Sequence, residues 1–248
     1  MIDAALNVGC RALEVPDATP GARVPAHVLY PTTAAPDAAR FGPYTLDVAR
    51  DAPMAGPPGP AVVISHGNGG TPWGYRGLAA ALARAGCVVV LIEHPGNSRT
   101  DNALAGTPAN LANRPRHVRR ALDALIADAD LGAHVVPDRA AVIGHSIGGY
   151  TALAVAGGRP MALPHETADG VAAPVPVEPD PRVRAVVLLA PALPWLMAPG
   201  ALAGVHARVW ARTGASDEVT PPEFIERVLR GLPAAADHLD GVAAAGPR

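Results

Sequence analysis

The sequence predicts an α/β domain with a mostly parallel sheet, helices on both faces and an antiparallel hairpin at its N-terminal end. Its 248 residues are 49% hydrophobic and 17% charged, which is enough apolar material for one large core. Short apolar runs alternate with segments of helical spacing, and this alternation is typical of parallel sheets. We therefore expect a single domain over residues 1–248.

The N-terminal hairpin is expected within residues 11–30. Two short apolar runs, ALEV and VPAHVLYP, flank the turn-rich stretch DATPGAR. This pattern is typical of paired strands joined by a turn. A segment rich in proline and glycine, residues 51–60, then leads into the parallel part of the sheet.

The remaining elements follow from apolar runs and helical periodicity. We expect strands at 61–65, 87–92, 139–144, 183–189 and 207–211, and helices at 73–85, 115–129, 147–156 and 221–229. The last helix is expected to start with a threonine cap and prolines in its first turn. Residues 157–182 lack periodicity and carry proline, glycine and charge, so we interpret them as a lid-like loop.

Charge and composition limit the classes of partner. The formal net charge is -2 and the chain has no lysine, so we expect no nucleic-acid partner. No basic segment precedes an apolar stretch at the N-terminus, and no run reaches about 18 apolar residues, which predicts a cytoplasmic protein without a membrane span. Cys10 and Cys87 lie far apart, and nothing demands that they form a disulfide or a metal site.

The strongest chemical signal is the motif GHSIGG at residues 144–149, which fits G-x-S-x-G. It lies between an expected strand and an expected helix, where such a motif forms a strained turn that exposes its serine. We expect Ser146 to be a nucleophile and the Ile147 N–H to face a developing oxyanion. A glycine-rich packing turn is the alternative. A nucleotide phosphate loop does not fit, because neither of its glycine patterns can be written here.

A second glycine-rich turn, SHGNGG at residues 65–70, directly follows the strand at 61–65. A loop with so little side-chain bulk can wrap a backbone donor around a tetrahedral centre, and we expect that donor to be the Asn68 N–H. His66 is interpreted as a structural turn residue rather than a general base.

An acidic residue, Asp217, follows the strand at 207–211. The carboxyl end of a late strand is where a carboxylate can orient a histidine for a nucleophilic serine. The alternative is that Asp217 caps the next helix, and both roles can hold together.

Together these motifs resemble a known family. FGPY at 41–44, SHGNGG, IEHPGNS at 92–98, GHSIGG and the pattern G-x-x-D-x-x-x-P at 214–221 are similar to α/β-hydrolases described as predicted dienelactone hydrolases, which resemble platelet-activating-factor acetylhydrolases. The resemblance covers about residues 8–246. It implies an α/β-hydrolase fold and an esterase-like serine hydrolase with a Ser, Asp, His triad, no metal and no organic cofactor.

The triad histidine is the point where the sequence departs from that pattern. The one histidine after Asp217 is His238. If residues 240–245 form the last strand, His238 precedes it and lies roughly 15–20 Å from Ser146. The family's last strand runs into Ala-Gly-His-Phe, and here Pro247 follows Ala245 and Gly246. We expect a truncated or frame-shifted copy; the alternatives are that His238 or a histidine elsewhere is the base.

Two functions remain open from the sequence. The first is hydrolysis of a small or short-acyl carboxylic ester through an acyl-enzyme, with the ester as the small-molecule partner. The second is a non-catalytic protein of the same fold that lacks its triad histidine. The sequence does not separate esters from thioesters, lactones or amides, and it gives no oligomeric state.

Overall fold

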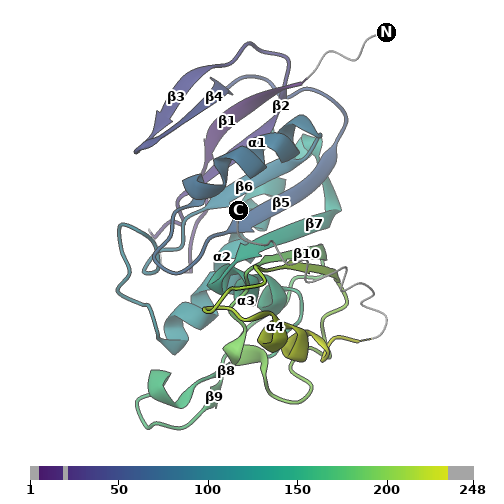
Figure 1. Ribbon diagram of the computed structural model, residues 1–248. Coiled ribbons are helices and arrows are strands. Elements are labelled where there is room, and N and C mark those ends of the chain that lie inside the picture. Colours follow the sequence, from purple (N-terminus) through teal and green to yellow (C-terminus); the bar gives the residue numbers. More distant parts are fainter. Residues whose placement is uncertain (1–5, 19–21, 234–248) are drawn as a thin grey trace.

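The computed structural model describes residues 6–18 and 22–233, and within them it shows a twisted nine-stranded sheet (Figure 1). The strand order is β11-β10-β7-β5-β6-β2-β1-β4-β3. The strands are β1 Asn7–Leu13, β2 Ala26–Thr32, β3 Asp37–Phe41, β4 Tyr44–Arg50, β5 Gly59–Ser65, β6 Val88–Ile92, β7 Val135–His145, β10 Val183–Leu189 and β11 Arg208–Arg212. The predicted α/β fold is confirmed.

The five strands β6, β5, β7, β10 and β11 are parallel neighbours. Their centres are apolar along their length, since both faces of the sheet are covered; all five residues of β6 are buried. The apolar runs in the sequence therefore predicted each of these strands, and the predicted ends differ from the observed ends by a few residues.

The other side of the sheet is mostly antiparallel. β1 pairs with β2 from Leu13 opposite Ala26 to Asn7 opposite Thr32, so the predicted N-terminal hairpin is confirmed. A second hairpin, β3 with β4, was not predicted. It turns at Gly42, whose φ of 59° favours glycine. Its strands alternate buried and exposed residues at the sheet edge, and this pattern is weaker than an unbroken apolar run.

Helices cover the two faces of the sheet in separate layers. One core cluster packs α1 (Arg76–Arg84) against the sheet, and a short 3-10 turn, Pro72–Tyr75, precedes that helix. The other cluster lies on the opposite face and includes α2 (Pro108–Ala127), α3 (Ile147–Val155) and α4 (Pro222–Leu229). Within the described ranges, no helix is long and apolar enough to cross a membrane.

Helix α2 starts seven residues before the predicted position. Thr107 caps it by accepting a hydrogen bond from the Asn110 N–H (3.2 Å), and Pro115 lies inside it. A proline lacks the N–H that would bond the carbonyl four residues earlier, here that of Leu111. The buried Tyr150 hydroxyl donates to that carbonyl instead (3.0 Å). The helix therefore continues through a residue that the sequence alone places at its start.

The expected threonine cap of α4 was wrong. Its N-cap is Pro221, whose side chain has no atom that can accept a hydrogen bond. The Thr220 hydroxyl donates to Asp217 instead (2.9 Å).

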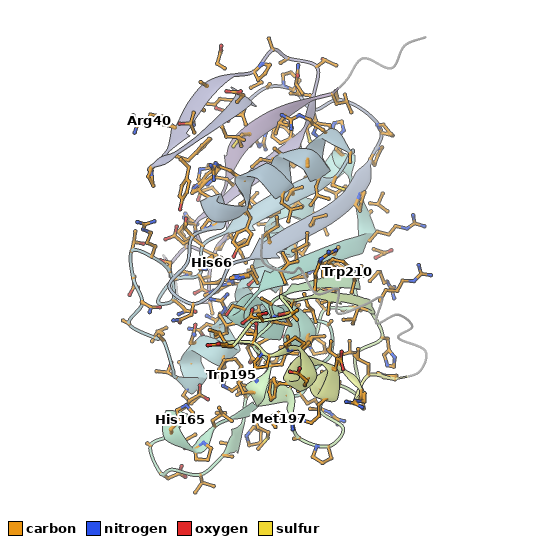
Figure 2. All side chains as sticks on the ribbon, in the orientation of Figure 1. Arg40, His66, His165, Trp195, Met197 and Trp210 are labelled. Carbon is orange, nitrogen blue, oxygen red and sulfur yellow. The ribbon has the colours of Figure 1, made fainter. Side chains whose placement is uncertain are left out.

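Residues 157–182 form an excursion below the main sheet in Figure 1, with a small hairpin of β8 (Met161–Ala162) and β9 (Ala173–Pro174). The Trp195 indole N–H donates to both carboxylate oxygens of Glu166 in this segment (3.0 and 2.8 Å). His165, Trp195 and Met197 lie together at that end of the molecule (Figure 2).

Candidate active site

The three predicted site segments meet at one edge of the sheet. Ser65, at the end of β5, pairs with Gly144 of β7; Leu189, at the end of β10, pairs with both His145 and Arg212. The loops that follow these parallel strands therefore emerge side by side, as the carboxyl ends of parallel strands do.

Ser146 lies at the sharp turn between β7 and α3. Its φ of 53° and ψ of -122° are unusual for a residue with a side chain. The neighbouring glycines are required by space. A Cβ on Gly144 would lie 2.0 Å from the Gly148 oxygen, and a Cβ on Gly148 would lie 2.1 Å from the Ser65 oxygen. The G-x-S-x-G spacing therefore matches a backbone packed too closely for other residues.

The peptide unit between Ser146 and Ile147 is held at its carbonyl end. The Ser146 oxygen accepts hydrogen bonds from the N–H groups of Gly149 (2.8 Å) and Ala192 (2.9 Å), and the Ser146 N–H donates to Leu189 (3.0 Å). The other end of this unit is the Ile147 N–H, which donates to no residue that the structure describes.

The 66–70 loop lies directly against the serine. A Cβ on Gly67 would be 3.4 Å from the Ser146 Cβ. The Gly67 oxygen accepts from the Gly70 N–H (3.1 Å) and from His66 Nδ1 (2.8 Å), and this carbonyl belongs to the same peptide unit as the Asn68 N–H. Like the Ile147 N–H, the Asn68 N–H has no acceptor among the described residues.

His66 is part of this turn rather than a candidate base. It is fully buried, and its Nε2 accepts a hydrogen bond from the His94 N–H (3.2 Å). Its Nδ1–H therefore donates to Gly67, which fixes one neutral tautomer. Burial, together with the nearby Arg114 charge, lowers the pKa of His66 to about 4. These contacts fit the interpretation of His66 as a structural turn residue.

Asp217 is fixed in the loop after β11. One carboxylate oxygen accepts from the N–H groups of Val219 (3.0 Å) and Thr220 (2.8 Å). These bonds, above all that of the Thr220 amide, hold the pKa of Asp217 below its usual range. Burial lowers the pKa of His145, and the negative charge of the Asp217 carboxylate acts against this lowering. The Asp217 charge is therefore felt at His145, the residue before Ser146. Asp217 orders the approach to α4 without being its N-cap.

The sequence-based predictions about the base fall on residues 234–248, which lie outside the described part of the chain. They concern His238, the strand at 240–245 and Pro247. Among the described residues, no side chain makes a hydrogen bond to the Ser146 hydroxyl.

Three residues near the site were missed by sequence reasoning. The Tyr75 ring lies 5.9 Å from the His145 ring. Asn97 Nδ2 donates to the Asn68 side chain (2.6 Å), and Arg114 Nη1 donates to Asn97 (2.6 Å). The motif IEHPGNS could have pointed to Asn97 as a site residue. No sequence pattern pointed to Arg114, because the predicted helix began one residue after it.

Comparisons with known proteins agree with this architecture. The model of the "Alpha/beta hydrolase family" matches residues 62–247. A solved structure of a ferulic acid esterase from Streptomyces cinnamoneus superposes with a TM-score of 0.64 at 20% identity, over 93% of this chain and 72% of that one. No curated protein matches the chain, and the narrower resemblance to dienelactone hydrolases stays a prediction. Since the family model covers most of its length, the chain belongs to the alpha/beta hydrolase family.

Proposed function

We propose that this protein is a serine hydrolase that cleaves a small or short-acyl carboxylic ester through an acyl-enzyme. The observation that carries the proposal is the position of Ser146. It lies on a strained turn beside two peptide units, Gly67–Asn68 and Ser146–Ile147. The carbonyl of each unit accepts two hydrogen bonds, and the N–H groups of the same units, those of Asn68 and Ile147, have no acceptor among the described residues. Donors fixed before the reaction stabilise the charge that develops in acyl transfer.

In the proposed reaction the Ser146 oxygen attacks the ester carbonyl carbon and its proton passes to a histidine. The carbonyl oxygen becomes an oxyanion that accepts hydrogen bonds from the Asn68 and Ile147 N–H groups. Collapse of this intermediate breaks the ester bond, and the alcohol leaves with the proton. Water then attacks the acyl-enzyme, gives its proton to the same histidine, and releases the acid and the serine.

Asp217 is proposed to orient that histidine and to balance its charge. His238 is the candidate that follows Asp217 in the sequence. The His238→Gln variant tests it: if His238 is the base, the variant should lose labelling and turnover, and unchanged rates would place the base elsewhere.

The proposal as a whole is tested by covalent labelling with a fluorophosphonate and by turnover of p-nitrophenyl acetate. Wild type should label in a one-to-one ratio, and Ser146→Ala should not label and should lose at least about 10³-fold in turnover. Ser216→Ala is the matched control, because Ser216 is exposed and should be dispensable. A folded wild type that does not label at neutral pH would refute the proposal.

A second candidate is a non-catalytic protein of this fold. It is favoured by the sequence at Pro247, where the family that it resembles has the triad histidine. Without a histidine, the oxyanion donors and substrate binding would still give about 10³–10⁴-fold catalysis over water. Pro247→His, measured beside wild type, separates the two: a rise of orders of magnitude supports the second candidate, and one-to-one labelling of wild type without such a rise supports the first.

A further inference from the structure

Beneath the candidate site, Arg114 is a buried cation that has no counter-ion in the described part of the chain. Its side chain is fully buried, and it takes part in none of the ion pairs among the described residues. Burial lowers the pKa of its guanidinium to about 9, which leaves it charged at neutral pH. Burying an unpaired charge costs several kcal/mol. Such a cost calls for a role other than stability.

Within residues 6–18 and 22–233, Arg114 has four hydrogen-bond partners, all of them neutral, and they belong to three separate segments. Nε donates to the Thr151 hydroxyl on α3 (3.0 Å), and Nη1 donates to Asn97 in the loop after β6 (2.6 Å). Nη2 donates to the Ser65 hydroxyl (3.2 Å) and to the carbonyl of the next residue, His66. The planar fork of one guanidinium therefore ties these segments together.

Two of these contacts lead to the Asn68 side of the site. The His66 carbonyl is the start of the 66–70 loop. Asn97, oriented by Arg114, donates through Nδ2 to the Asn68 side chain (2.6 Å) and to the Asn102 side chain (2.7 Å). Arg114 thus holds both the backbone and the side chain of the loop that carries the Asn68 N–H.

The third contact leads to the Ile147 side. The Thr151 hydroxyl, which accepts from Arg114, donates in turn to the Ile147 carbonyl (3.1 Å). The Tyr150 hydroxyl bond to Leu111 fixes α2 against α3 one turn away from Arg114 (3.0 Å). One side chain therefore connects the two segments that carry the proposed oxyanion donors.

We propose that Arg114 is a positioning residue for this site: it sets the Asn68 loop against the Ser146 elbow and places a fixed positive charge behind the developing oxyanion. The proposal rests on the proposed function, because the oxyanion arises only in acyl transfer. In a low-dielectric interior an unpaired cation stabilises such transient negative charge more strongly than it would in water. It also polarises the His66–Gly67 peptide to which it donates.

The test compares Arg114→Gln, which removes the cationic group, with Arg114→Lys, which replaces the planar fork of five donors by one ammonium group. Arg114→Gln should lower kcat and the rate of fluorophosphonate labelling about 10²-fold, with KM changed less than about 3-fold. Arg114→Lys should lose about 10-fold. The matched control is Arg182→Gln. Arg182 lies just before β10, at the end of that strand away from the site, and it pairs with Asp180 and with Asp123 of α2, so this variant should keep wild-type rates.

A folded Arg114→Gln with rates within about 3-fold of wild type would overturn the proposal. If Arg114→Gln does not fold, Arg114→Lys is measured in its place, and rates of that variant within about 3-fold of wild type would overturn the proposal. Hydrogen exchange provides a readout without turnover: Arg114→Lys should raise exchange at residues 66–70 and 146–151 and not in β1 or β2. If wild type fails to label, the proposed function is refuted, and unchanged exchange in both segments would separately refute the positioning role.

Discussion

Acid should destabilise this protein well above the pH at which carboxylates titrate, because three buried histidines are neutral in the fold. Burial lowers the pKa of His66 and of His117 to about 4 and moves that of His94 in the same direction; the Arg114 charge adds to all three. An unfolded chain has histidine pKa values near 6.5, so it binds more protons than the native state between these values. Stability is then complete above about pH 6.5 and falls as the pH falls toward 4.

The size of the loss follows from the two shifts that have values. From pH 8 to pH 5, a histidine whose pKa drops from 6.5 to about 4 loses about 2 kcal/mol of stability. His66 and His117 together give about 4 kcal/mol, a large part of the stability of most domains. Since His94 Nδ1 lies 3.1 Å from His117 Nδ1, the protons are taken up by the cluster rather than by single residues.

Urea unfolding at pH 8 and pH 5, followed by circular dichroism, measures this difference. His117→Gln should reduce the loss by about 2 kcal/mol, because one titrating group is gone. His206→Gln is the control: His206 is exposed, and the variant should keep the wild-type loss. Equal free energies of unfolding at both pH values in wild type, within about 0.5 kcal/mol, would refute the reasoning.

Three further predictions concern other parts of the fold. Gly148→Ala places a Cβ 2.1 Å from a backbone oxygen of β5, so it should cost more than about 2 kcal/mol in urea unfolding, and wild-type stability would contradict this packing. Glu166→Ala leaves the Trp195 indole N–H without its acceptor, so limited proteolysis should cut within 157–182 faster than in Glu166→Gln; equal rates would argue against this anchor. Burial raises the pKa of the Cys10 thiol to about 12, so iodoacetamide at pH 8 should modify the half-buried Cys87 first by mass spectrometry, and equal rates would contradict it.

The parts of the fold that could be predicted are those in which local pattern and burial agree. The parallel strands are covered on both faces and read as apolar runs, and the elbow glycines are fixed by backbone contact, so a short motif identifies them. The start of α2 could not be predicted, because the residue that permits Pro115 inside the helix is Tyr150 on another helix. A sequence pattern along α2 contains no trace of that partner.

The candidate site divides in the same way. Ser146, Asn68, Ile147 and Asp217 follow strand ends, and topology alone brings them to one edge of the sheet. Arg114 lies in a helix that contains other arginines, and the feature that distinguishes it from them is its burial, which only the packed structure shows. The sequence therefore indicates the groups proposed to react but not the group proposed to hold them.

The charge of Arg114 and the pKa values of the three buried histidines depend on one another. Removing that charge should therefore make the free energy of unfolding less sensitive to acid, even where it lowers stability at pH 8. The Arg114 charge helps to lower the pKa of His66, His94 and His117 in the folded state. Removing it should raise these pKa values toward 6.5 and narrow the gap between folded and unfolded states. Arg114→Gln, even if less stable at pH 8, should therefore lose less free energy of unfolding between pH 8 and pH 5 than wild type does. The same urea series measures this variant, and a loss in Arg114→Gln as large as in wild type would show that burial alone keeps the histidines neutral.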